Sequence, residues 1–237
     1  MRRFRKLNYS NQLDEVKAII KNKMFDANLK DDDLFYFNVN LDKDGLPEIG
    51  TGKPDDHLAI SMSSKKLLNN LQHKGCFHID CTYKVIKNGF PVLVFGITDR
   101  QGHFHPIAFH ITSHEEEGDF SNFYNGLIKI AKDLDIAFEP EFIMQDAWTA
   151  SYNAAIKCFP KATVLMCYYH VMDNTKKHLN KLNDKSDDLK DEVMELMRYI
   201  HMSPNEKEFN NRKKTFEEDF KLKHADFYNY VKKAVVR

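Results

Sequence analysis

Several features that would assign this chain to a class of protein are scarce or missing. Only four cysteines are spread over 237 residues, too few for a secreted disulfide scaffold, so they indicate a reducing compartment. Nine glycines and seven prolines are too few for a low-complexity chain. No apolar run approaches the ~20 residues of a membrane span, and the basic start, MRRFRKLNYS, lacks the apolar stretch of a signal peptide. These absences predict a soluble intracellular protein with no membrane partner.

An excess of positive charge is missing as well. Lys and Arg together total 35, Asp and Glu together also total 35, and the formal net charge is zero. This balance excludes a protein that holds nucleic acid by bulk positive charge, so any contact with DNA has to be local. Apolar residues are plentiful, at 42% of the chain with 12% aromatic, which is enough to build a sizeable core.

The first 75 residues predict a mixed α/β lead-in. The pattern indicates a short helix over 11–24 and a strand over 33–40, which a turn at 41–45 closes. Residues 58–63 are a candidate pairing partner for that strand. A helix is expected over 63–75, with a serine at its N-cap and Gly75 as its terminator.

From residue 76 onward the pattern changes to strand-like runs. Three runs, over 76–85, 90–99 and 103–112, are joined by the short turns KNG and RQG, which predicts an antiparallel meander. The chain then continues with a helical pattern, a strand, a helix and a strand, at 117–134, 141–146, 148–159 and 162–167. A helical crossover makes the fourth strand parallel to a strand of the meander.

The ribonuclease H-like fold has this order of elements, with its fourth strand beside its first. We therefore expect an α/β protein with a ribonuclease H-like mixed sheet, made of the three-strand meander and two further strands, with flanking helices. The expected organisation is a lead-in over 1–75, a core over 76–170 and a helical region over 171–237.

Two aspartates stand where this topology would bring them together. Asp80 lies inside the first core strand and Asp146 ends the fourth, so neighbouring strands would place both carboxylates at one edge of the sheet. A carboxylate inside an apolar strand is costly unless it is paired or binds a metal, and we expect Asp80 to be such a residue. Two oxygen-ligated divalent ions can activate the attacking oxygen and stabilise the leaving oxygen in phosphodiester chemistry. For Asp146, the alternative is an ordinary helix N-cap.

Other candidate residues have structural explanations. Cys167 and His170 form a Cys-x-x-His pair, which is half of a zinc site, but structural zinc normally has four protein ligands, so zinc is not favoured. We instead expect the pair to support the fold or the active site. Trp148 is expected to anchor the core. The histidines of HFHPIAFH fit a strand with one exposed face better than a metal cluster.

A series of short motifs then occurs in a fixed order. The series comprises Asp80, Thr82, Tyr83 and Lys84; Asp99, Gly102, Pro106 and Ala108; Glu115 to Glu117 with Phe120 and Phe123; Asp146, Ala150, Ala154, Ala155, Ile156, Phe159 and Pro160; and Cys167, His170, Asn174, Lys176 and Lys177. The ordered set, which spans roughly 33–180, resembles the transposase domain of Mutator-like elements (MULE), of the ribonuclease H-like DDE superfamily.

This resemblance implies metal-dependent DNA cleavage and strand transfer. Asp80 and Asp146 would be the first two catalytic carboxylates and would bind Mg²⁺ or Mn²⁺. Its partner would be DNA, both as transposon ends and as target. The resemblance is also compatible with a homo-oligomer, and it implies a nuclear location. The third carboxylate, a Glu in a Thr-x-Asn-x-x-Glu-like segment, is not found, because Glu206, Glu208, Glu217 and Glu218 fit solvated helix charges. The alternative is therefore an inactive, domesticated or decayed remnant that binds DNA or protein.

Overall fold

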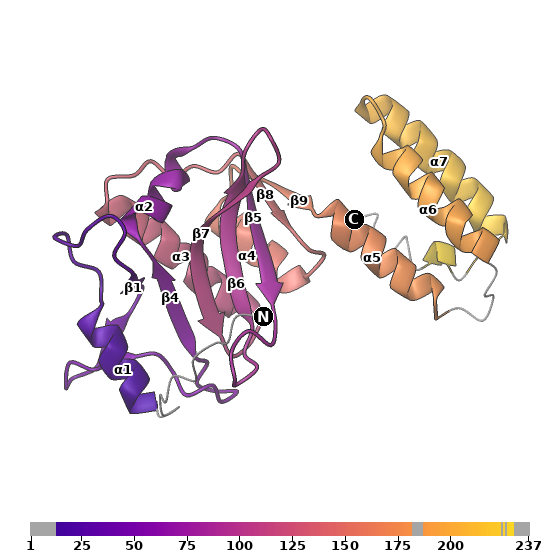
Figure 1. Cartoon of the computed structure of the whole chain (residues 1–237). Helices are drawn as coiled ribbons and strands as arrows, with labels where there is room; N and C mark the ends of the chain where they lie inside the picture. Colours follow the sequence, from indigo (N-terminus) through magenta and orange to yellow (C-terminus); the bar gives the residue numbers. More distant parts are fainter. Residues whose placement is uncertain (1–12, 182–186, 224, 226, 230–237) are drawn as a thin grey trace, which may run out of the picture. The chain divides into compact units, whose positions relative to one another are not determined.

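The computed structural model describes residues 13–181, 187–223, 225 and 227–229 (Figure 1). The chain divides into two compact units, with the division between Leu165 and Met166. The first unit contains a mixed sheet with helices on it, and the second is helical. The expected α/β class is therefore confirmed. Within the described residues, none of the helices combines the length and the apolar character needed to cross a membrane.

A mixed sheet organises the first unit. Within the described residues it has seven strands, in the order β1-β4-β7-β6-β5-β8-β9. Their bounds are β1 Phe35–Phe37, β4 Ala59–Ser63, β5 Cys76–Thr82, β6 Val92–Thr98, β7 Phe104–Thr112, β8 Phe142–Gln145 and β9 Thr163–Met166. Strands β5, β6 and β7 pair antiparallel, and β8 lies parallel beside β5, which confirms the predicted meander and the predicted place of the fourth strand.

Alternation along the strands explains why they form. In β5, Phe77 and Ile79 are buried while the residues between them face the other side, as a strand with one packed face requires. In β6, Phe95 stacks on Phe77 with ring centroids 5.5 Å apart. Each fully buried ring of this kind contributes about 1.5–3 kcal/mol of hydrophobic stabilisation. The same alternation aims the intervening side chains of β5 away from the core.

Gly96 marks an irregularity between β6 and β7. The register shifts between Phe95 and Gly96, and a Cβ at Gly96 would lie 2.4 Å from the Phe104 ring and 2.5 Å from the His105 carbonyl oxygen. Only glycine fits so close an approach of backbone and ring.

Two helices pack together against the core of the first unit (Figure 1). Helix α3 (Glu117–Asp133), predicted over 117–134, buries an apolar stripe that includes Phe120, Tyr124 and Leu127. It begins with a capping box between Glu116 and Asp119. Helix α4 (Thr149–Cys158) contributes small buried residues, which allow it to pack closely on α3. Helix α3 follows β7 and helix α4 follows β8, each after a short loop, so the first residues of both helices lie near the ends of these strands.

The lead-in residues join the same sheet. Strand β1 pairs antiparallel with β4, as predicted, and β4 extends the meander by pairing with β7. Helix α1 (Leu13–Asn22), a small hairpin of β2 (Asn40–Leu41) and β3 (Pro47–Glu48), helix α2 (Lys65–Leu68) and the 3-10 turn η1 (Asn69–Gln72) complete this segment. Ser64 is the N-cap of α2 and accepts a hydrogen bond from the Leu67 N–H. The hairpin was not predicted.

The second unit has its own apolar core. Its helices are α5 (Tyr168–Leu179), α6 (Asp187–His201) and α7 (Glu206–Lys223). Leu189, Val193 and Met197 of α6 are buried and form one apolar core with Phe216 of α7. Of the acidic residues considered for a third catalytic position, all four lie on α7; Glu208 forms an ion pair with Arg212 there.

Candidate functional site

Asp80 lies on β5, and Asp146 directly follows β8, the adjacent parallel strand. Cys76 of β5 pairs with Phe142 of β8, and His78 pairs with Met144. Continuing this register by two residues sets Asp80 beside Asp146, at the carboxyl ends of both strands. Ligands of α/β sheets commonly bind in the crevice outside the carboxyl ends of parallel strands.

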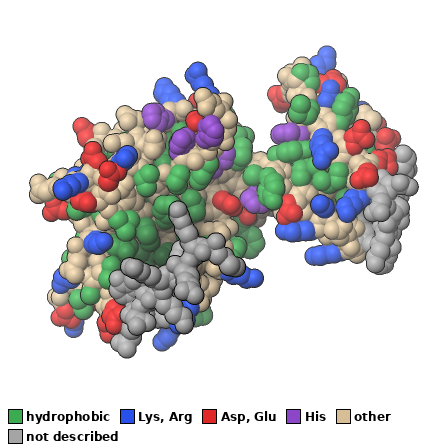
Figure 2. All heavy atoms as spheres, in the orientation of Figure 1, with side chains coloured by type: hydrophobic (Ala, Val, Ile, Leu, Met, Phe, Trp, Pro, Cys, Tyr) green, Lys and Arg blue, Asp and Glu red, His purple; other side chains and the backbone are tan. Residues whose placement is uncertain are grey.

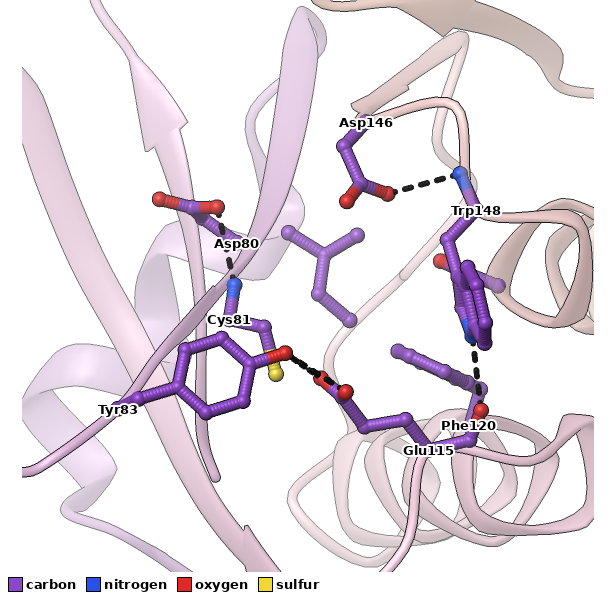
Figure 3. Close-up of a pocket in the computed structure, with 9 residues that line it drawn as sticks. Asp80, Cys81, Tyr83, Glu115, Phe120, Asp146 and Trp148 are labelled. Carbon is purple, nitrogen blue, oxygen red and sulfur yellow. Dashed lines mark hydrogen bonds between the residues drawn. The ribbon is translucent and has the colours of Figure 1, made fainter. Parts of the chain in front are cut away.

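A pocket of about 140 Å³ opens at this edge of the sheet and contains both aspartates (Figure 3). It is lined by Ile79, Asp80, Cys81, Tyr83, Glu115, Phe120, Asp146, Trp148 and Ser151. These residues come from β5 and the loop after it, the loop before α3, α3, the loop after β8 and α4. The tertiary structure thus brings the two predicted site residues to one cavity.

Asp80 lies within β5, as predicted, but its side chain is exposed, so the expected cost of burying a carboxylate in this strand does not arise. The reason is the alternation of β5, which sends Phe77 and Ile79 into the core and leaves Asp80 on the open face near the strand end. Its Oδ1 accepts a hydrogen bond from the N–H of Cys81 at 3.0 Å. Exposure leaves this carboxylate accessible to a solvated cation.

Asp146 is half-buried and does not occupy the N-cap position of α4, which belongs to Trp148. The Asp146 Oδ1 accepts a hydrogen bond from the backbone N–H of Trp148 at 3.0 Å (Figure 3). This bond turns the chain between β8 and α4. The ordinary helix-cap explanation therefore does not account for Asp146, although its carboxylate does order the loop before the helix.

Glu115 is the residue that sequence reasoning missed. The Tyr83 hydroxyl lies 2.7 Å from Glu115 Oε1 and 2.6 Å from Oε2, so one phenolic proton is shared by both oxygens (Figure 3). The indole N–H of Trp148 donates to the Glu115 backbone carbonyl at 2.8 Å. The acidic stretch from Glu115 to Glu117 was visible in the sequence, but nothing in its pattern indicated a place beside Asp80.

Trp148 is 53% exposed, so the prediction of a core anchor is wrong. The indole is at the N-cap of α4, where the backbone has left the core, and its N–H is directed to the loop before α3. An amphipathic ring in this position satisfies its donor and keeps much of its surface in contact with solvent.

The thiol and the phenol of the pocket remain protonated at neutral pH. Burial raises the pKa of the Cys81 thiol, and the nearby Glu115 carboxylate raises it further. Burial also raises the pKa of Tyr83, again with help from Glu115. A thiol is a weak nucleophile compared with a thiolate, so Cys81 is not set up for nucleophilic catalysis. Tyr83 stays a hydrogen-bond donor.

The donor chemistry of the pocket suits a hard divalent cation. Asp80, Glu115 and Asp146 supply carboxylate oxygens, and Mg²⁺ is usually held by one or two carboxylates together with water and substrate phosphates. Within the described parts of the chain, no group of three or more His, Cys, Asp or Glu side chains is arranged to hold one metal ion. A cation at this pocket would need water or a substrate phosphate to complete its coordination.

Cys167 and His170 lie in the second unit. Cys167 occupies the N-cap position of α5 and His170 is in the first turn of that helix. In the first unit, His78 accepts or donates a hydrogen bond with the Thr98 hydroxyl at 2.8 Å, and burial lowers its pKa. The four cysteines are free thiols, each half-buried. The role of the Cys-x-x-His pair stays a prediction.

The histidines around β7 follow the predicted pattern of one exposed face. His103 and His105 are exposed and both contact Asp99 Oδ2, at 3.3 and 3.0 Å. His110 points to the other face, is completely buried and shares a 2.9 Å hydrogen bond with the Ser61 hydroxyl. His103 and His105 therefore stabilise the turn that contains Asp99, and His110 is part of the buried core.

Comparison with known families agrees with the motifs. The family described as MULE transposase domain matches residues 76–174, from the first residue of β5 to the middle of α5. The resemblance inferred from the ordered motifs is confirmed for this segment, which contains the pocket and the Cys-x-x-His pair. No protein with a curated description matches the chain.

Proposed function

We propose that residues 76–174 are the ribonuclease H-like core of a DNA transposase, which cleaves DNA and transfers strands with a divalent cation. The observation that carries this proposal is the convergence of Asp80 and Asp146 in one pocket at the carboxyl ends of β5 and β8. The meander with a parallel fourth strand beside its first is the strand order of ribonuclease H-like folds. The family match over 76–174 supports the assignment to transposition.

Asp80 and Asp146 would hold Mg²⁺ or Mn²⁺ through their carboxylate oxygens. When bound, such a cation would polarise the scissile phosphate and lower the pKa of an attacking water or DNA 3′-hydroxyl. The chain itself orients the two carboxylates. The Cys81 N–H holds Asp80, the Trp148 N–H holds Asp146, and both donors are fixed by backbone that belongs to packed elements.

DNA is the partner that follows from this proposal, with the nucleus as the location of its chromosomal substrate in a eukaryotic cell. Lys and Arg side chains are interspersed with Asp and Glu on the face shown in Figure 2. With a formal net charge of zero, phosphate contacts would be few, so DNA binding would be weak, and its decrease with rising salt would be shallow. Assays should therefore start at low ionic strength.

Titration calorimetry with Mn²⁺ tests the proposal. We expect weak binding to the wild type, reduced on the order of tenfold or more in Asp146→Asn because a negatively charged ligand is lost while the shape is kept. Asp133→Asn, at the exposed end of α3, is the matched control and should bind Mn²⁺ like the wild type. Equal binding by wild type and Asp146→Asn would refute the site.

The alternative function is a non-catalytic remnant that binds DNA or protein through the same fold. It is favoured by the arrangement of the described side chains, among which no three potential ligands converge on one ion. Cleavage of a labelled DNA duplex with Mn²⁺ separates the two. Slow cleavage abolished by Asp80→Asn and by Asp146→Asn supports the enzyme, whereas DNA binding without cleavage, unchanged in both variants, supports the remnant.

A further inference from the structure

A histidine of the lead-in segment contacts the first turn of α3. His57 belongs to the loop between β3 and β4, and its Nδ1 lies 2.8 Å from Asp119 Oδ1. The Asp119 side chain is 6% exposed and the His57 side chain is 24% exposed, so the contact is largely shielded from water. Neither residue lines the pocket, and the metal chemistry proposed above uses neither of them.

Both ring nitrogens of His57 face acceptors. Nε2 lies 3.0 Å from the backbone carbonyl oxygen of Pro54, which can only accept, and Nδ1 faces the Asp119 carboxylate. A neutral imidazole has a single N–H, so it can donate to one of these oxygens but not to both. Both contacts are satisfied when a His57 imidazolium is paired with an ionised Asp119. In agreement, the hydrogen bond to Asp119 raises the pKa of His57 above its ordinary 6.5.

The same carboxylate connects the lead-in loop to the turn that carries Glu115. Asp119 Oδ2 accepts a hydrogen bond from the Glu116 N–H at 2.9 Å, while Oδ1 contacts His57. The preceding residue, Glu115, accepts the indole N–H of Trp148 on its backbone carbonyl at 2.8 Å. Asp119 therefore links His57, through Glu116, to one wall of the pocket.

Further contacts join the same two segments. The His57 ring stacks on the His114 ring, with centroids 3.8 Å apart and an angle of 14° between the ring planes. The Leu58 N–H donates to the Ser113 hydroxyl at 2.9 Å, and the Ser113 N–H donates to the Leu58 carbonyl at 3.1 Å. The bonds between Leu58 and Ser113 do not titrate. They keep the two segments together at any pH, so protonation of His57 acts on the turn alone.

The charged groups around His57 favour its protonated form. Besides Asp119, the Glu116 carboxylate at the start of α3 raises the pKa of His57. His114 faces the imidazole as the stacked ring. His110 of β7 is completely buried, and burial lowers its pKa to about 4, so it is neutral beside Asp119 at physiological pH. Loss of the His57 proton would leave a nearly buried carboxylate without its cationic partner, which is unfavourable.

We propose that His57 and Asp119 form a pH-sensitive clamp, closed while His57 is protonated, that positions the turn carrying Glu115. As His57 loses its proton, Asp119 loses its partner, and the turn that Asp119 holds through Glu116 loosens. Because the pKa of His57 is raised in the folded chain, this stabilisation is complete below pH 6.5 and is lost as pH rises through the raised pKa. The inference goes beyond the proposed function and assumes nothing about what the pocket binds.

Long-range ¹H–¹⁵N NMR of the histidine rings in the full chain measures the protonation of His57. We expect both of its ring nitrogens to carry a proton in the closed clamp, and its pKa to lie above 6.5. Asp119→Asn should lower that pKa, because the amide keeps the shape of the side chain without its charge. A wild-type pKa at or below 6.5 would overturn the proposal, and this titration needs no variant to fold.

Trp148, the single tryptophan of the sequence, reports on the turn through its bond to Glu115. Acrylamide quenching of its fluorescence is followed from about pH 6 to about pH 9, the range in which a histidine of raised pKa titrates. We expect quenching to increase in a step whose midpoint matches the pKa of His57 from NMR, and no step in His57→Gln. His73→Gln, an exposed histidine after η1, is the control and should keep the step. A step that survives His57→Gln, or no step in the wild type, would reject the clamp.

The clamp and the metal site fail separately. Loss of Mn²⁺ binding in Asp146→Asn, with no step in the wild type, would keep the catalytic core and reject the clamp. A step that depends on His57, combined with unchanged Mn²⁺ binding in Asp146→Asn, would reject the metal site and keep the clamp.

Discussion

Strands β5 and β7 flank β6, and both carry titratable side chains, which they use in different ways. The carboxyl end of β5 brings Asp80 to an open pocket, where Asp146 and Glu115 accept hydrogen bonds from a backbone N–H and a phenol. At the start of β7, His105 contacts Asp99, and near the end of β7, His110 is buried beside Ser61.

The difference lies in the donors around each carboxylate. Asp99 accepts hydrogen bonds from the N–H groups of Gln101 and His103 and contacts two imidazoles. The contact with His105, followed by the His103 N–H, holds its pKa at about 2. Such a carboxylate stabilises a turn, and few of its lone pairs are left to bind a cation. Asp80 and Asp146 also accept a backbone N–H, so the contact with two imidazoles is what sets Asp99 apart from them.

The largest effect we expect comes from the buried histidine of β7. Burial lowers the pKa of His110 to about 4 from an ordinary value of 6.5. Between these values the unfolded chain binds a proton that the folded chain does not, so the free energy of unfolding falls as pH decreases from 6.5 to 4, by up to about 3 kcal/mol. Urea unfolding at pH 7.5 and 4.5 measures this loss. His110→Gln should show a smaller loss, and identical losses in both proteins would contradict the account.

Mn²⁺ binding tests directly whether the environments of Asp80 and Asp99 differ as we infer. Asp80→Asn should weaken binding on the order of tenfold, because Asp80 is accessible and at the pocket. Asp99→Asn should change binding less than about twofold, because the Asp99 oxygens are already occupied by donors. Calorimetry at pH 7 measures both. A larger effect of Asp99→Asn would mean that the histidine-bound carboxylate is the metal site.

The hydroxyl of Tyr83 should have a moderate effect on stability. Tyr83→Phe removes the hydrogen bond to Glu115 and keeps the ring, so we expect a loss of about 1 kcal/mol in this partly exposed position. A loss of this size lowers the melting temperature by about 2–4 °C in a chain of this length. Tyr152→Phe, on the exposed side of α4, is the control. Equal melting temperatures for wild type and Tyr83→Phe would show that the bond adds nothing.

The smallest effect concerns Asp99 and is visible as a titration. A pKa held below the ordinary 3.8 means that Asp99 adds stability above that pH, and that this contribution is lost as pH falls through about 2. NMR titration of the Asp99 carboxyl carbon should give a pKa near 2 in the wild type. In His105→Gln the pKa should rise toward 3.8. An unchanged value would remove His105 as the main cause.

Local pattern predicted most of the elements of the first unit. The alternation over 76–112 indicated the meander, and helical spacing indicated α3, because each depends on residues a few positions apart. The hairpin of β2 and β3 escaped prediction, since strands of two residues carry no periodic signal. The pairing of β4 with β7 also escaped prediction, because it joins segments that are distant in the sequence.

The candidate site was predicted in part. The crossover rule placed Asp80 and Asp146 near each other, and both line one pocket. The exposure of Asp80 and Trp148 was predicted wrongly. In each case the local sequence is apolar enough to suggest burial, whereas the position at a strand end or a helix start leaves the side chain in solvent.

The sequence alone therefore indicated the order of the elements and the closeness of Asp80 and Asp146. It also indicated the family that the segment over 76–174 resembles. Only the tertiary structure decided that Glu115, Tyr83 and Trp148 belong with them. The two hydrogen bonds that join these three residues span 32 and 33 positions of the chain. Such contacts leave no periodic signal, because they form when β5, the loop before α3 and the start of α4 are brought to one sheet edge by packing of the shared core.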